Sequence, residues 1–342
     1  MEKRMRFVFV AVFFLAVLVI VYRMPEVGPL EENAGEYEAA SGQEPGKVDS
    51  VTFEGIVQSL KDGDARLYRE IERMAEEQRI EPVDAKVDPV WKAIPGYNGL
   101  ELDVEQTYKL SRGQDRIFPV YREVPPRVQL EDLGAHPIYK GNPRKPMAAL
   151  MINVAWGNEY LPVMLDILRD ANVKATFFLD GSWLEKHADL AQEIVKEGHE
   201  IGNHAYSHKN MSELSRSAAY EEISKTQKLI REKLNVESTL FAPPSGDYDE
   251  ETVEIAYGMN MKTILWTLDT VDWKNPAPEA IVRKITMRLE PGALILMHPT
   301  SSASQALPEL IRNIKNKGLA LGTVSELLSP KRLDQVESFF QF

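Results

Sequence analysis

After residue 146 the chain alternates between short apolar runs and longer amphipathic segments. Runs of four to eight apolar residues are typical of buried strands, and apolar positions at helical spacing predict helices. Strands that alternate with helices run parallel, because the crossover helix returns the chain to the same end of the sheet. We therefore predict an α/β fold, a distorted (β/α) barrel, over residues 146–330. The predicted strands are 148–154, 175–179, 199–202, 239–242, 263–268, 293–297 and 319–323, and the predicted helices are 161–169, 183–197, 212–234, 250–257, 278–289 and 304–317.

Residues 51–145 have a different pattern, which predicts a small α+β domain. Leu67, Tyr68 and Ile71 fall at helical spacing, so we expect a helix from Ala65. Two segments, 100–104 and 117–124, are predicted to be short strands separated by turns. We find no residue pattern typical of a catalytic site in this region, and we expect it to be a spacer or a recognition module.

The N-terminus carries an unbroken apolar run at residues 7–22, with basic residues before it and Arg23 after it. A helix of that length rises about 24 Å, which suffices to span a bilayer if the flanking arginines snorkel. The run predicts a signal-anchor helix within residues 1–23. Residues 24–50 are predicted to be an acidic linker, and residues 331–342 a C-terminal tail. The charge asymmetry favours a membrane-anchored protein whose bulk is extracytoplasmic. A cleaved signal peptide is the alternative, although no small-x-small cleavage site follows Arg23.

The composition of the chain excludes several kinds of binding and catalytic site. The formal net charge is −12, which opposes nucleic-acid binding through a general basic surface. The chain has no cysteine, so disulfides, thiolate catalysis and cysteine zinc sites are excluded. Any metal must be held by histidines and carboxylates.

Active sites of barrels lie at the C-terminal ends of the strands, so the residues that follow each predicted strand are the candidates for a functional site. They include Asn153, Val154, His204, Tyr206, His208, Ala242, Pro244, Asp269, Asp272, Trp273 and His298. Together with segment 198–204, their order and spacing resemble the polysaccharide deacetylase family, a carbohydrate esterase type also called the NodB homology domain, over about residues 146–328. Segments 152–160 and 241–246 are similar to a sporulation-associated, membrane-anchored branch.

The resemblance implies metal-dependent hydrolysis of an N-acetyl amide, with zinc or another divalent cation activating a water. It implies that the substrate is an N-acetylated glycan, either peptidoglycan or chitin-like. His204 and His208 correspond to two metal ligands and His298 to the general acid. Asp269 and Asp272 belong to the motif whose acid orients that histidine. Trp273, Tyr206 and Pro244 are assigned to the substrate groove.

Three positions depart from the family pattern. Asn153 and Val154 stand where we align the family's two adjacent aspartates, the general base and the third metal ligand, and Ala242 replaces an arginine that orients the base. An amide does not accept a proton at neutral pH, and a valine side chain has no lone pair for a metal. Glu159 or Asp180 are candidate surrogates, although both also suit ordinary roles in a helix first turn and a turn.

Three interpretations follow. In the first, the protein still hydrolyses N-acetyl groups with a surrogate carboxylate. In the second, it is a catalytically degenerate member that binds glycan or protein partners as a scaffold. Zinc binding should then be weak, because two imidazoles alone do not complete a zinc site. In the third, residues 51–145 dock a protein partner and the barrel carries no activity.

Overall fold

A computed structural model of the protein describes residues 53–333. The predicted signal-anchor helix, the acidic linker and most of the C-terminal tail lie outside these residues. No helix among residues 53–333 combines the length and the apolar character needed to cross a membrane.

The barrel region is built on a parallel sheet centred on β5 (Met147–Val154). The strand order is β10-β11-β5-β6-β7-β8-β9, and β12 pairs with the beginning of β5. All pairs in this sheet are parallel, as the alternation of strand and helix predicts. The other strands are β6 (Thr176–Leu179), β7 (Glu200–Asn203), β8 (Leu240–Phe241), β9 (Lys262–Thr263), β10 (Leu268–Asp269), β11 (Leu294–Met297) and β12 (Ala320–Gly322).

The two ends of this strand path, β9 and β10, come from one apolar run that was predicted to be a single strand, 263–268. That prediction is wrong, because the backbone of the run changes partners along its length. The N–H of Ile264 donates to β8 at Phe241, that of Leu265 to Ile138, and that of Thr267 to β11 at Leu294. The run therefore crosses between the two ends of the sheet, and Ile138 forms a parallel bridge to Ile264 in the gap.

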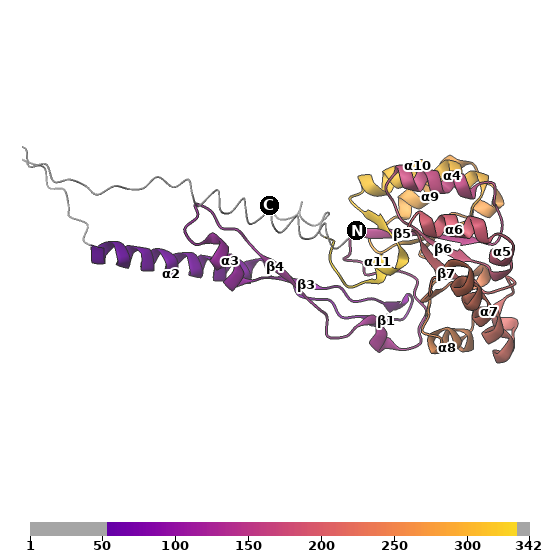
Figure 1. The fold of residues 1–342 in the computed structure, drawn as a ribbon, viewed down its shortest axis with the longest axis horizontal. Coiled ribbons are helices and arrows are strands. Elements are labelled where there is room, and N and C mark those ends of the chain that lie inside the picture. Colours follow the sequence, from indigo (N-terminus) through magenta and orange to yellow (C-terminus); the bar gives the residue numbers. More distant parts are fainter. Residues whose placement is uncertain (1–52, 334–342) are drawn as a thin grey trace, which may run out of the picture. The chain divides into compact units, whose positions relative to one another are not determined.

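Helices cover one face of the sheet, and Figure 1 shows α4, α9 and α10 together along one side with α5, α6 and α7 following further round. The predicted helix 183–197 is two helices that meet at His187, and the short α11 was not predicted. The helices are α4 (Leu161–Asp170), α5 (Gly181–Lys186), α6 (Ala188–Lys196), α7 (Arg216–Leu234), α8 (Glu250–Gly258), α9 (Pro278–Arg288), α10 (Ser301–Asn316) and α11 (Val324–Leu328).

Alternation along β5 separates two cores. Leu150, Ile152 and Val154 pack with helix residues such as Leu161 in the core between sheet and helices. Met147, Ala149 and Met151 point to the opposite face, into a core shared with Leu240, Ala242, Leu294 and Leu296. Because successive side chains of a strand point to opposite faces, Asn153 continues the inner row and Val154 the outer one.

The region before the barrel holds helices and two antiparallel strand pairs, β1 with β2 and β3 with β4. The helix predicted from Ala65 begins earlier, at Phe53. Helix α3 was not predicted; it begins after Asp103, whose side chain caps it by accepting from the N–H of Gln106 at 2.9 Å. The elements are α2 (Phe53–Glu77), β1 (Lys86–Asp88), β2 (Lys92–Ile94), β3 (Gly99–Leu102), α3 (Val104–Ser111) and β4 (Tyr121–Val124).

Candidate functional site

A cavity of about 480 Å³ lies where the C-terminal ends of the parallel strands meet. The sheet register explains this grouping. Met297 of β11 pairs with Ile152 of β5, so His298 follows β11 beside Asn153. Leu179 of β6 pairs with Asn203 of β7, so His204 follows β7 at the same end of the sheet. Six residues singled out from the sequence line the cavity together. Its wall is formed by Asn153, Trp156, His204, His208, Ser245, Trp266, Asp269, Trp273, Leu296 and His298.

His204 is held in one tautomer. Its Nδ1 lies 2.7 Å from the carbonyl oxygen of Ala242, and a carbonyl only accepts, so Nδ1 carries the proton and Nε2 keeps its lone pair. Burial and the neighbouring His208 lower the pKa of His204 to about 3. His204 is therefore a neutral imidazole, the form that ligates metals or accepts hydrogen bonds.

His208 sits at the end of a strained loop, with its ring centroid 5.2 Å from that of His204. Both Ala205 and His208 have positive φ angles, 57° and 55°, which L-residues rarely adopt. Glu222 of α7 holds the loop: its carboxylate accepts from the N–H of Tyr206 at 3.0 Å and from the N–H and hydroxyl of Ser207 at 2.7 and 2.6 Å. Glu222 cannot be singled out from the sequence, because a glutamate within a charged helix resembles any solvated one.

His298 is oriented by Asp272, as the family resemblance implies. The carboxylate of Asp272 is fully buried and accepts from the backbone N–H of His298 at 2.9 Å and from its Nδ1 at 3.1 Å. The hydroxyl of Thr270 donates to the same carboxylate at 2.5 Å. Asp269 has a different position: it lines the cavity and accepts from the N–H of Val271 at 2.8 Å.

Trp156 enters this cluster, and sequence analysis did not single it out. Its indole stacks on the ring of His298, with centroids 5.3 Å apart, and meets His208 edge-on at 6.1 Å. Trp156 is therefore the residue after β5 whose side chain lies against the cavity histidines.

The sequence-based placement of the lost metal ligand at Val154 is wrong in geometry. Val154 is fully buried in the core between sheet and helices, on the face of β5 away from the cavity. Ala242 is also fully buried in the inner core and reaches the site through its carbonyl oxygen alone. Of the three positions that depart from the family pattern, Asn153 is the one whose side chain lines the cavity.

Two residues assigned to the substrate groove lie elsewhere. The hydroxyl of Tyr206 donates to Glu185 of α5 at 2.7 Å, and its ring lies under the ammonium of Lys225. Pro244 is buried, and its neighbour Ser245 lines the cavity instead. Trp273 does line the cavity, with 56% of its surface exposed.

The two candidate surrogate carboxylates differ. Glu159 is exposed on the loop after β5. Asp180 is 2% exposed and caps α5, because its Oδ1 accepts from the hydroxyl of Ser182 at 2.7 Å and the N–H of Trp183 at 2.9 Å. Burial raises the pKa of Asp180, against those hydrogen bonds and the charge of His208, and its Oδ2 has no hydrogen-bond partner.

The residues present do not fit the family's metal site. Within residues 53–333 no three His, Cys, Asp or Glu side chains come together as a set that could hold a metal ion. Of the side chains that line the cavity, His204 and His208 have imidazoles that lie together, with ring centroids 5.2 Å apart, whereas a catalytic zinc uses three protein ligands. The ring of Trp156 stands beside His208, where a third donor would be needed.

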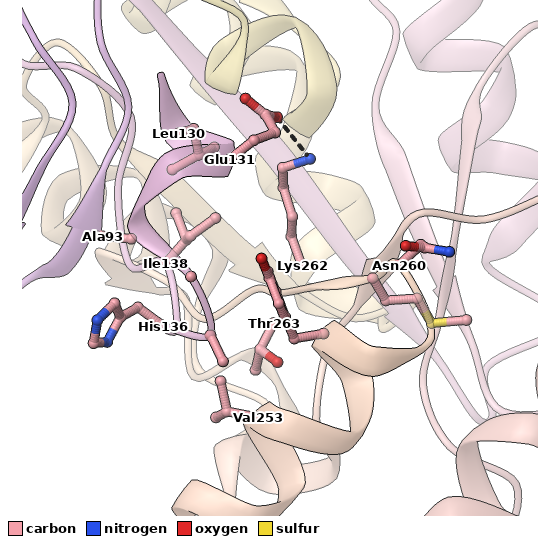
Figure 2. A pocket seen from close by; sticks show the side chains of 13 residues that line it. Ala93, Leu130, Glu131, His136, Ile138, Val253, Asn260, Lys262 and Thr263 are labelled. Atoms are coloured by element: carbon pink, nitrogen blue, oxygen red, sulfur yellow. Dashed lines mark ion pairs between the residues drawn. The ribbon is translucent and has the colours of Figure 1, made fainter. Parts of the chain in front are cut away.

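A second cavity, of about 330 Å³, lies between the segment before the barrel and α8 and β9. Figure 2 shows Lys262 of β9 reaching towards Glu131, with which it forms an ion pair at 3.2 Å, and Val253 of α8 on the other side. No residue predicted to be functional lines this cavity.

The fold and the site define a deacetylase-type barrel, and comparison with known proteins agrees. The polysaccharide deacetylase family model matches residues 140–264. The chain is 47% identical over 270 residues to the uncharacterized protein YlxY of Bacillus subtilis, covering 78% of this chain and 85% of that protein. It is 31% identical over 199 residues to a peptidoglycan-N-acetylglucosamine deacetylase of Bacillus cereus, covering 57% and 72%. The chain belongs to the polysaccharide deacetylase family.

Solved structures give the same assignment. The crystal structure of BA3943 from Bacillus anthracis, described as a pseudoenzyme of carbohydrate esterase family 4, is 44% identical, with a TM-score of 0.74 over 78% of this chain and 96% of that one. A BA3943 mutant described as having restored enzymatic activity is 43% identical, with a TM-score of 0.74 over 78% of this chain and 99% of that one.

Proposed function

We propose that this protein binds N-acetylated cell-wall glycan in the histidine and tryptophan cavity without hydrolysing it. The observation that carries the proposal is the position of Trp156, stacked on His298 and edge-on to His208. An indole there supplies no metal ligand, so the cavity lacks a group on which the family's reaction depends. The remaining wall is suited to recognition.

Aromatic surface supports glycan as the ligand. Trp156 and Trp273 are 44% and 56% exposed although both line the cavity. The apolar C–H faces of a sugar ring pack on aromatic faces, while its hydroxyls hydrogen-bond to polar groups such as Asp269. The relative from Bacillus cereus is named a peptidoglycan-N-acetylglucosamine deacetylase, and peptidoglycan that contains N-acetylglucosamine is the ligand class we carry over to this chain.

A second candidate function is residual hydrolysis of N-acetyl groups, with zinc or another divalent cation bound weakly. One observation favours it: Asp180 has a buried, unpartnered Oδ2 close enough to His208 for the imidazole charge to favour its ionisation. Asp180 would then act as the third ligand. Its bonds to Ser182 and Trp183 must survive the rearrangement.

We extend the proposal to location. The apolar run at residues 7–22, with basic residues before it and an acidic stretch after it, would anchor the chain and place the barrel outside the cytoplasm. Cell-wall glycan is on that side of the membrane. We also propose a role in envelope assembly or sporulation, because segments 152–160 and 241–246 are similar to the sporulation-associated branch of the family.

The test uses the full-length protein in detergent, with calorimetric binding to N-acetylated chito-oligosaccharide and, in parallel, acetate release in zinc or cobalt. We expect binding that falls in Trp273→Ala, and no acetate release. Acetate release that His204→Ala abolishes would replace the binding function with the second candidate, and Asp180→Asn would then test the surrogate ligand. Absence of glycan binding by the folded protein would overturn the proposal.

A further inference from the structure

The loop between β5 and α4 carries Trp156, and its backbone is held on both sides of that residue. Before it, the N–H of Asp180 donates to the carbonyl oxygen of Val154 at 3.0 Å. After it, Gly157 has a φ of 83° and packs against Pro299 so closely that its backbone leaves no room for a Cβ. Trp156 itself is 44% exposed, so packing covers only part of the indole. Its stacked position therefore depends on how the loop is held.

Asn158 ties this loop to α5 through both ends of its side-chain amide. The indole Nε1 of Trp183 donates to Oδ1 of Asn158 at 2.6 Å. An indole N–H only donates, so the amide oxygen must face Trp183 and the amide nitrogen must face the other way. There Nδ2 lies 3.2 Å from Nε2 of His187, which therefore accepts a hydrogen bond. Trp183 is 3% exposed, so Asn158 also satisfies a donor that burial would otherwise leave unpaired.

The two partners of the amide belong to one rigid unit. The N–H of His187 donates to the carbonyl oxygen of Trp183 at 2.9 Å, and their rings lie 5.6 Å apart. The amide of Asn158 therefore fixes the loop to the end of α5. Trp156 is two residues before Asn158, and the glycine between them has no side chain that could hold the loop by itself.

We propose that Asn158 is a positioning residue, which holds the loop after β5 so that the indole of Trp156 stays stacked on His298. This inference rests on the proposed function in one respect, because Trp156 is part of the wall of the cavity in which we place the glycan. It goes further by assigning the residue that fixes this wall. Asn158 does so from outside the cavity, since it is not among the residues that line it.

The experiment detects the stacking directly, by nuclear magnetic resonance of the full-length protein in detergent with isotope-labelled histidine. An aromatic ring shields nuclei over its face, so the ring protons of His298 should resonate upfield of their position in Trp156→Ala. Asn158→Leu keeps the shape of the side chain and removes both hydrogen bonds, and it should move the His298 signal most of the way to that position. Asn158→Asp should keep the wild-type signal, because a carboxylate accepts from Trp183 and, with the other tautomer of His187, from its Nε2.

Calorimetry on the same proteins measures what the loop position does for binding. Affinity for N-acetylated chito-oligosaccharide should fall roughly two- to tenfold in Asn158→Leu, as the loss of one aromatic contact gives, and should be kept in Asn158→Asp.

The outcomes separate this inference from the function on which it rests. A His298 signal that stays at its wild-type position in folded Asn158→Leu overturns the inference, because a bond that only stabilises the fold leaves Trp156 stacked. An Asn158→Asp variant whose signal matches that of Asn158→Leu overturns it too. A wild type that shows the stacked signal and binds no glycan overturns the proposed function, whereas the positioning role of Asn158 then stands.

Thermal unfolding checks that each variant folds. If Asn158→Leu does not fold, Trp183→Phe removes the same hydrogen bond from the other side and should move the His298 signal in the same direction. An unmoved signal in that variant overturns the inference.

Discussion

The indole of Trp156 lies against the imidazole of His298, with ring centroids 5.3 Å apart and planes 14° from parallel. The same indole meets His208 at 6.1 Å and 69°, so it stands beside two of the three cavity histidines. Aromatic pairs of this kind add about 0.5–1.5 kcal/mol beyond the area they bury. Trp156 therefore stabilises the site in its present form while it occupies space beside the imidazoles.

Trp156→Asp should create a zinc site from His204, His208 and the new carboxylate. Two imidazoles alone leave the donor set incomplete, and a third ligand completes the number found in catalytic zinc sites. We expect zinc to bind at least about tenfold more tightly than to the wild type, a difference of roughly 1.4 kcal/mol. Isothermal titration with zinc measures it.

The matched control is Trp273→Asp, which removes another exposed indole of the cavity and adds the same charge. It should leave zinc affinity within about twofold of the wild type, because Trp273 does not contact the histidines in the ring pairs of the described residues. Equal zinc affinity for Trp156→Asp and Trp273→Asp would show that position 156 is not next to the metal-binding imidazoles.

Val154→Asp should destabilise the fold without creating a metal site. Val154 has no exposed surface and packs with Leu161 and other apolar side chains in the core between sheet and helices. A carboxylate buried there has no partner, which costs about 3–5 kcal/mol. Urea unfolding should show that loss for Val154→Asp and a much smaller one for Trp156→Asp, and a stable Val154→Asp that binds zinc would reverse our placement of the two side chains.

The sequence predicted the barrel because each buried strand and each amphipathic helix bears its own periodicity. It did not predict where the run at 262–269 changes partner, since the hydrogen bonds of Leu265 and Thr267 go to segments distant in the chain. Short helices such as α3 were missed because Asp103 as a cap is a weak signal beside a strand.

The candidate site was predicted in part, for a physical reason. Histidines after strands are visible in the sequence, and the register brings His204 and His298 to one cavity. The position of Trp156 in the cavity depends on where β5 ends and how the chain turns after it. A sequence pattern does not show this, so Trp156 could not be distinguished from other loop residues. The role of Glu222 depends on the packing of α7 against the loop, which a sequence pattern does not contain.

Asp272→Asn should loosen His298. The carboxylate accepts three hydrogen bonds, two from His298 and one from Thr270, and an amide would turn a donor towards one of these donors. We expect a loss of about 1–3 kcal/mol in the free energy of unfolding, measured with urea. Asp269→Asn is the control, because Asp269 accepts one local bond from Val271 and should lose much less. Equal losses for the two variants would mean that Asp272 does not hold His298.

Glu222→Gln should remove a pH-dependent part of the stability. Burial opposes ionisation of Glu222, but the hydrogen bonds from Ser207 and Tyr206 and the charge of Lys209 outweigh it and lower its pKa. A carboxyl whose pKa is lower in the folded state stabilises the protein above its unfolded pKa, near 4.5, and this contribution is lost as the pH falls through the folded pKa.

We therefore expect Glu222→Gln to be less stable than the wild type at pH 7 by about 1–3 kcal/mol, because buried bonds to a charged acceptor are lost. The difference should shrink as the pH falls below about 4.5, where the wild-type carboxyl begins to be protonated in the unfolded chain. Urea unfolding from pH 7 to pH 3.5 measures it, and Glu221→Gln, on the exposed side of the same helix, is the control. A difference that stays constant across this range would show that the charge of Glu222 does not hold the loop that carries His208.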